Sequence, residues 1–172
     1  MAKPSTPKSA SAGTPATTAL TRSGVSFRVH HFENDIPVGE HGYGRAAAQA
    51  LGVDETRVFK TLLVNVIAPT PSHAVAVVPV SGQLSLKAMA AALGAERVEM
   101  LDAPSAERVT GYVVGGISPF GQRKRLTTVV DSSALEHPTV FVSGGRRGLD
   151  IEVSPTQLVD HLGATVAPIA TD

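Results

Sequence analysis

The sequence predicts a mixed α/β domain built on a curled sheet flanked by helices. Short β-branched runs bounded by Gly, Pro, Asp or Ser are typical of strands, and alanine-rich segments that close on a glycine are typical of helices. The strand-like runs gather towards the C-terminal half instead of alternating strictly with long helices. This order favours a curled mixed sheet or half-barrel over a doubly wound parallel sheet.

Four segments carry helix signals, and each ends at a glycine: residues 14–24, 44–52, 85–94 and 154–163. Thr14 is an expected N-cap, because the proline that follows it suits the first helical position. Ser154 and Gln157 have the spacing of a capping box at the start of the last segment.

Seven further runs have the composition of strands. They are residues 25–32, 57–67, 73–80, 111–116, 126–133, 139–145 and 148–153. Together with the helix segments they predict one domain over residues 14–172. Residues 1–13 contain Pro, Ser, Ala and Lys but no large apolar side chain apart from the initial Met, so we expect a disordered tail.

The composition excludes several kinds of site. The 172 residues include 15 basic and 15 acidic side chains, so any attraction for nucleic acid must come from a local patch. The lack of cysteine excludes disulfides, thiolate metal sites and a cysteine nucleophile. The six histidines have no metal-site spacing, and no apolar run is long enough to span a membrane. We expect a cytoplasmic protein without metal or cofactor.

Lys60 lies inside an expected strand whose two faces are both largely apolar. Such a lysine can sit near the strand end and extend its ammonium to water, which is the interpretation that pattern alone favours. Alternatively, the ammonium projects into a pocket and binds a carbonyl, carboxylate or phosphate, where desolvation strengthens the contact. The second interpretation calls for an acidic partner nearby.

The glycine-rich segment 111–121 could approach a ligand with its backbone. Its centre, Gly115, Gly116, Ile117 and Ser118, could present free N–H groups as donors. A plain connecting loop explains this composition equally well.

A second glycine-rich segment, residues 141–152, begins with Ser143 and ends with an acidic residue pair. A hairpin turn explains its glycines without a function. Asp150 would face the side opposite its two apolar neighbours, and an exposed strand face is the simpler interpretation.

Five of the 15 basic side chains fall in two short segments, Arg123, Lys124 and Arg125 in one and Arg146 and Arg147 in the other. Clusters of this kind are usually solvated surface. If the two loops met, they would form a local phosphate-binding patch on a neutral protein.

Four quoted segments together resemble the YbaK/EbsC family, the free-standing relatives of the editing domain inserted in bacterial prolyl-tRNA synthetases. They are VFKTLLV, VPVSGQLSLKAMAAALGA, TGYVVGGISPFGQRKRL and VFVSGGRRGLDIEV, in the family's order. The likeness runs from about Thr14 to the end. It implies a mixed, barrel-like sheet flanked by helices, and an enzyme that removes cysteine mischarged onto tRNA(Pro), and by extension Cys-tRNA(Cys). An aminoacyl-tRNA substrate and a complex with prolyl-tRNA synthetase are the implied partners.

The resemblance also implies roles for single residues. Lys60 matches the family's essential lysine, and Asp150 matches the aspartate of its GLDIE segment, expected to orient Lys60 or the α-ammonium. Gly115 matches the first glycine of the substrate-binding loop, Ser143 a small residue of the pocket wall, and Phe32 the position of a pocket tyrosine. Further expected substrate contacts are Thr61, Gly116, Ile117 and Ser118, and expected tRNA-backbone contacts are Arg123, Lys124, Arg125, Arg146 and Arg147.

The family mechanism is substrate-assisted, because the cysteinyl thiol itself attacks the ester carbonyl and displaces the tRNA. Such a mechanism suits a chain without cysteine. Two alternatives stay open: Phe32 in place of tyrosine could adapt the pocket to Ala-tRNA(Pro) or another small aminoacyl-tRNA, and the basic segments could belong to a non-catalytic tRNA- or synthetase-binding module.

Overall fold

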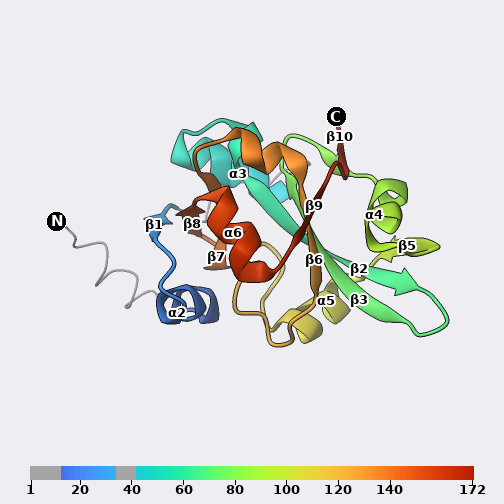
Figure 1. Cartoon of the computed structure of the whole chain (residues 1–172). Coiled ribbons are helices and arrows are strands. Elements are labelled where there is room, and N and C mark those ends of the chain that lie inside the picture. The colour runs from blue at the N-terminus through green and yellow to red at the C-terminus, as the bar shows by residue number, and fades with distance from the viewer. Residues whose placement is uncertain (1–12, 34–41) are drawn as a thin grey trace.

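Two larger sheets curl around a shared core in the computed structural model, which describes residues 13–33 and 42–172. The five-stranded sheet has the order β5-β2-β3-β6-β9, and the three-stranded sheet has the order β1-β8-β7 (Figure 1). The expected disordered tail lies outside the described residues, except for Gly13.

The five-stranded sheet is mixed. It consists of β5 (Arg97–Met100), β2 (Phe59–Ile67), β3 (Ser72–Pro79), β6 (Thr127–Asp131) and β9 (Thr165–Ala167). β2 is antiparallel to both β3 and β5, whereas β3, β6 and β9 run parallel to one another. A short pair of β4 (Gln83–Leu84) with β10 (Ala170–Thr171) lies beside it.

The three-stranded sheet is antiparallel. It consists of β1 (Phe27–His31), β8 (Leu149–Val153) and β7 (Val140–Arg146). Within the described residues, one isolated parallel bridge, Val58 to Phe141, joins it to the five-stranded sheet. The predicted mixed α/β fold is therefore confirmed, but the sheets do not close and the expected barrel-like form is not confirmed.

Five α-helices and two 3-10 turns lie in the described part of the chain. They are α2 (Pro15–Arg22), α3 (Gly42–Leu51), η2 (Glu55–Arg57), α4 (Leu86–Leu93), α5 (Ala103–Thr110), η3 (Ser132–Glu136) and α6 (Pro155–Leu162). Helix α5 and the strands β4, β5, β9 and β10 were not predicted from the sequence.

The predicted helix starts at Thr14 and Ser154 are confirmed, with one difference in detail. The Thr14 hydroxyl accepts from the Thr17 N–H, and the Thr17 hydroxyl accepts from the Thr14 N–H, so this cap is complete. Ser154 accepts from the Gln157 N–H, but the Gln157 side chain accepts from the Ser26 N–H instead of returning to its own cap. Gln157 thus links α6 to the start of β1.

The predicted strand over residues 111–116 is wrong. Gly111 ends α5 in the left-handed conformation at φ 84°, and the chain then continues as a loop. The buried Tyr112 donates its hydroxyl to the Phe120 carbonyl at 2.6 Å, which folds the segment back on itself. The β-branched pair Val113 and Val114 had suggested a strand, but the hydrogen bond from Tyr112 to Phe120 holds this segment as a loop.

The main core lies between the two larger sheets. Alternate residues of β2 and β3, such as Phe59 and Val77, pack there against Ile151 of β8 and Leu20 of α2. The other face of the five-stranded sheet packs on Met89 of α4 in a second core. The other face of the three-stranded sheet lies towards α3 and the pocket described below.

Asp131 stabilises the C-terminal segment, and its removal provides a test of the fold. This buried carboxylate accepts from the N–H groups of Ile169 and Ala170, both at 2.9 Å, and from the Ser133 N–H and hydroxyl. Asp131→Ala should lower the free energy of unfolding by about 3 kcal/mol, because charge-assisted bonds are lost and two N–H groups lose their partner. In the same urea titrations, removal of the exposed α5 cap in Asp102→Ala should cost only about 1 kcal/mol. Equal losses would contradict this role of Asp131.

Candidate active site

A pocket of about 370 Å³ opens along one edge of β2. Its walls come mainly from β2, the start of α3, the loop after α5 and the β7–β8 hairpin. The chain just after β1, Val80 after β3, and the segment from β5 into α5 complete them. Of the residues expected at the site, those in its lining are Phe32, Lys60, Thr61, Gly115, Ile117, Ser143, Arg147 and Asp150.

The pocket exists because β2 loses its strand partner on this edge. Pairing with β5 begins only at Val64, and the Leu101 N–H donates to the Leu63 carbonyl just before it. At the other end, backbone pairing with β7 among the described residues is the single bridge at Val58. The Val58 carbonyl accepts from the Val80 N–H on the opposite side, so by alternation Phe59 faces β7 at the bridge and the backbone groups of Thr61 point towards the open edge.

Thr61 therefore brings polar groups to this edge. Its N–H and C=O follow the alternation just described, and its buried hydroxyl has no hydrogen-bond partner. Unpaired polar groups beside a pocket are positions where a ligand can gain hydrogen bonds that the free protein lacks.

Lys60 is half-buried in the pocket wall. Burial, with a smaller contribution from the positive charge of Arg45, holds the pKa of its ammonium below the usual value. Within the described residues no carboxylate forms an ion pair with it. Its charge is thus left to the pocket.

Asp150 lies on β8 between two neighbouring strands. It is paired with His30 of β1 and with Ser143 of β7, while its chain neighbours Leu149 and Ile151 point into the core. Only 5% of Asp150 is exposed, so the expected exposed strand face is wrong. Burial raises the pKa of its carboxyl to about 7.

The junction between the sheets brings Lys60 and Asp150 to one side. Val58 and Phe141 form a parallel bridge. Lys60 and Ser143 each come two residues later, so their side chains lie on the same face as Val58 and Phe141. Ser143 in turn is opposite Asp150. An amine and an acid with a perturbed pKa thus line one pocket, which is typical of a functional site.

The pocket rim contains a residue that the sequence pattern did not single out. Tyr43, 38% exposed at the start of α3, lies under the Arg147 guanidinium, 4.6 Å from the ring centroid. Arg147 also donates from Nε to the Val114 carbonyl at 2.9 Å. Gly115 has φ +91°, and a Cβ there would be 2.8 Å from the Arg147 Nε, so only glycine fits. An exposed tyrosine between glycines was the available signal for Tyr43.

Two residues of the same loop lie outside the pocket lining. A Cβ on Gly116 would be 2.6 Å from the Arg146 Cα, so this glycine allows close packing on the β7–β8 turn. Ser118 is fully buried and its hydroxyl accepts from the Phe120 N–H. In this structure Ser118 therefore shapes the loop instead of facing a ligand.

The two basic segments do not meet around one pocket. Arg123 donates to the Arg108 carbonyl in the last turn of α5, and Arg125 donates to the His161 carbonyl in the last turn of α6. Lys124 and Arg125 line a separate hollow, whereas Arg147 lines the first pocket. The arginines of the first segment thus stabilise helix C-termini, where cations are favoured.

Residues 13–33 and 42–172 contain neither a metal-binding cluster nor a membrane-spanning helix. No group of three or more His, Cys, Asp or Glu side chains there could hold a metal ion. No helix in the same ranges has the length and apolar character needed to cross a membrane.

The buried Asp150 carboxyl predicts an unusual dependence of stability on pH. Its pKa is about 7 in the fold against an ordinary value of 3.8, so the unfolded chain ionises first as pH rises. Stability should fall between about pH 4 and 7, by at most about 4 kcal/mol, and Asp150→Asn should remove this loss. Urea titrations should show the variant more stable at pH 8 and nearly unchanged near pH 4.

The control is Asp102→Asn, which should be less stable than the wild type at pH 8, because a hydrogen bond from Ser105 lowers the pKa of Asp102. A pH-independent difference for Asp150→Asn would contradict the expected titration.

Comparison with known proteins identifies the family. The sequence profile of the aminoacyl-tRNA editing domain matches residues 43–161. EbsC of Enterococcus faecalis, a candidate Cys-tRNA(Pro)/Cys-tRNA(Cys) deacylase, is 35% identical over 132 residues, covering 77% of this chain and 79% of EbsC. The fold matches a solved hypothetical protein with TM-score 0.79 and 27% identity over 91% of this chain and 99% of the other. It also matches a candidate trans-editing enzyme for prolyl-tRNA synthetase with TM-score 0.78 and 22% identity over 100% of both chains. The chain therefore belongs to the aminoacyl-tRNA editing domain family, as its resemblance to YbaK/EbsC proteins predicted.

Proposed function

We propose that this protein is a trans-editing deacylase that removes mischarged cysteine from tRNA(Pro), and by the same chemistry from Cys-tRNA(Cys). The observation that carries the proposal is the pocket in which Lys60, Asp150 and Gly115 meet at the open edge of β2 in an editing-domain fold. The relationship to EbsC supports cysteine as the amino acid.

The reaction uses the thiol of the substrate as the nucleophile. The sulfur attacks the ester carbonyl of its own cysteinyl group, an S–C bond forms, and the ester C–O bond breaks. The thiol proton passes to the departing 3′-oxygen of the tRNA, and the four-membered thiolactone that remains is hydrolysed by water. The chain has no cysteine, and this route requires no nucleophile from the protein.

Each polar group of the pocket has a role in this scheme. The Lys60 ammonium, which lacks an ion-pair partner among the described residues, binds the ester carbonyl or the terminal ribose and phosphate. Asp150 binds the α-ammonium, because a nearby cation restores the charged form that burial disfavours. The Thr61 and Gly115 N–H groups donate to the carbonyl oxygen as it gains charge.

The identity of the amino acid depends on the apolar part of the pocket. Phe32, Ala47, Leu62 and Ile117 line it, so it suits a small side chain and not a charged one. Phe32 lacks the hydroxyl of the family's tyrosine, which favours Ala-tRNA(Pro), or another small aminoacyl-tRNA, as the second candidate substrate.

The tRNA is recognised mainly through its 3′ end in this proposal. The formal net charge is zero, so only modest contacts to the RNA backbone are expected from the two basic segments, Arg123, Lys124 and Arg125 in one and Arg146 and Arg147 in the other. Prolyl-tRNA synthetase would then supply tRNA identity, in the cytoplasm. Binding of tRNA without turnover of any charged substrate would instead favour a non-catalytic module.

Replacement of Lys60 tests the active site. Lys60→Ala should reduce deacylation of Cys-tRNA(Pro) at least about 100-fold, the usual effect of losing a group that stabilises a developing oxyanion. Release of labelled cysteine by purified protein is the measurement. Lys87→Ala, at an exposed position on α4, is the matched control and should keep full activity. Undiminished activity in Lys60→Ala would remove Lys60 from the mechanism.

A substrate panel tests the choice of cysteine. Cys-, Ala- and Pro-tRNA(Pro) should be compared with and without prolyl-tRNA synthetase, and cysteine should be released at least about tenfold faster than alanine, since only cysteine carries the thiol nucleophile. Phe32→Tyr should alter the Cys to Ala ratio and leave Pro-tRNA(Pro) intact. A preference for alanine would transfer the assignment to the second candidate.

A further inference from the structure

Lys60 and Asp150 belong to different sheets that share little backbone pairing. Lys60 lies on β2 of the five-stranded sheet and Asp150 on β8 of the three-stranded sheet. Among residues 13–33 and 42–172, the bridge of Val58 to Phe141 is the one backbone bridge between these sheets. The shared core packs the two sheets together, but apolar packing is not directional and one bridge fixes the backbone at one point only. Directional side-chain contacts near the bridge can therefore help to set the distance between the two candidate catalytic groups.

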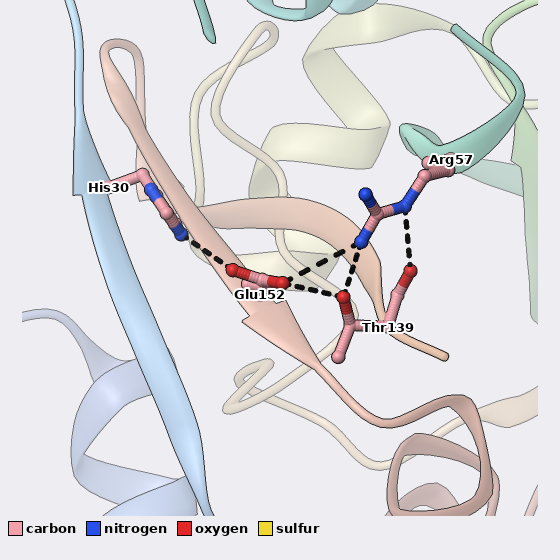
Figure 2. A network of polar contacts seen from close by, with 4 residues as sticks. All are labelled: His30, Arg57, Thr139 and Glu152. Carbon is pink, nitrogen blue, oxygen red and sulfur yellow. Dashed lines mark hydrogen bonds and ion pairs between the residues drawn. The ribbon is translucent and has the colours of Figure 1, made fainter. Parts of the chain in front are cut away.

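A side-chain network crosses this junction next to the bridge (Figure 2). Arg57, which directly precedes Val58, donates from Nε to the Thr139 carbonyl at 3.2 Å and from Nη2 to the Thr139 hydroxyl. The Thr139 hydroxyl donates to Oε2 of Glu152, and the Arg57 Nη2 lies 3.6 Å from the same oxygen. We call Arg57, Thr139 and Glu152 the clamp.

The clamp continues to the outer strand of the small sheet. Oε1 of Glu152 is 2.9 Å from Nε2 of His30 on β1. The His30 ring and the Arg57 guanidinium both contact the ring of Phe141, at 5.2 and 5.1 Å between centres. Four segments of chain are thus joined through one carboxylate and one aromatic ring.

The clamp is stronger than a surface ion pair. The Arg57 and Glu152 side chains are only 29% and 18% exposed, and the Thr139 hydroxyl donates one hydrogen bond and accepts another. Burial by itself would raise the pKa of Glu152, but hydrogen bonds from Thr139 and His30 outweigh it and hold the pKa below its usual value. Charge-assisted bonds in a partly dry environment resist separation more than exposed pairs do.

The clamp connects β8 to the turn that precedes β2, and the candidate catalytic pair lies on β8 and β2 themselves. Arg57 is three residues before Lys60, and Glu152 is two residues after Asp150 on the same face of β8. We infer that the clamp is a positioning device that sets the separation of Asp150 from Lys60 across the sheet junction. The expected effect on kcat rests on the proposed deacylase function. The expected effect on the sheet junction does not.

A pair of variants at Thr139 tests the clamp. Thr139→Val keeps the shape and removes the hydroxyl at the centre of the network, whereas Thr139→Ser keeps the hydroxyl. Thr139→Val should lower kcat for Cys-tRNA(Pro) by about tenfold or more with KM within about twofold, because a misplacement near 1 Å weakens the transition state more than binding. Thr139→Ser should stay within about twofold of the wild type in both constants. Arg57→Lys, which keeps the charge but loses the paired donors, should resemble Thr139→Val.

Hydrogen exchange gives a readout that needs no substrate. The backbone amides around Val58 and Phe141 should exchange faster in Thr139→Val than in the wild type and the serine variant. The control is Glu99→Gln, which breaks the exposed Arg97 to Glu99 pair of 3.3 Å and should change neither exchange at the junction nor kcat.

The outcomes separate the clamp from the proposed function. If the wild type deacylates Cys-tRNA(Pro) and Thr139→Val does so equally well, or if Thr139→Ser loses as much as Thr139→Val, the clamp is overturned and the deacylase stands. If the wild type releases no amino acid from any charged tRNA, the proposed function fails. Unchanged exchange at the junction in folded Thr139→Val and Arg57→Lys would then overturn the clamp on its own.

Discussion

The junction between β2 and β7 is the constraint on which the candidate site depends. β2 is paired with β3 along its length, but on its other edge it meets β5 only from Val64 onward and β7 only at Val58. A continuous ladder there would have paired the backbone groups of Thr61 and closed the pocket. The incomplete pairing therefore provides both the cavity and its donors, within a curled sheet that still buries a common core.

Burial of two ionisable groups beside this edge carries an energetic cost that a ligand can remove. Burial lowers the pKa of Lys60 and raises that of Asp150, so each group is driven towards its neutral form in the free protein. They line one pocket but form no ion pair with each other in this structure. An aminoacyl ester offers a carbonyl oxygen to the amine and an α-ammonium to the acid. The free protein is less stable because both groups are buried, but the same burial leaves them ready to bind a ligand that carries a partial negative and a positive charge.

The shape of the loop after α5 is fixed by contacts with the pocket rim and with the interior. Gly115 permits Arg147 and Tyr43 to approach the loop backbone. The Tyr112 hydroxyl, donated to the Phe120 carbonyl, fixes the loop on its buried side. The loop thus presents Gly115 and Ile117 to the pocket while Ser118 turns into the interior. Its composition permits several conformations, and contacts with distant segments select one of them.

The sequence alone determined features that depend on neighbours within a few residues. The caps at Thr14 and Ser154 and most strands could be read from local pattern, because capping, alternation and turn formation are short-range effects. Resemblance to a known family, and not local pattern, singled out Lys60 and Asp150. Tertiary structure decided the rest. It buried Asp150, turned residues 111–116 into a loop, paired Gln157 with Ser26 and brought Tyr43 under Arg147. Each of these outcomes depends on contacts between segments far apart in the chain, whose energies a local pattern does not contain.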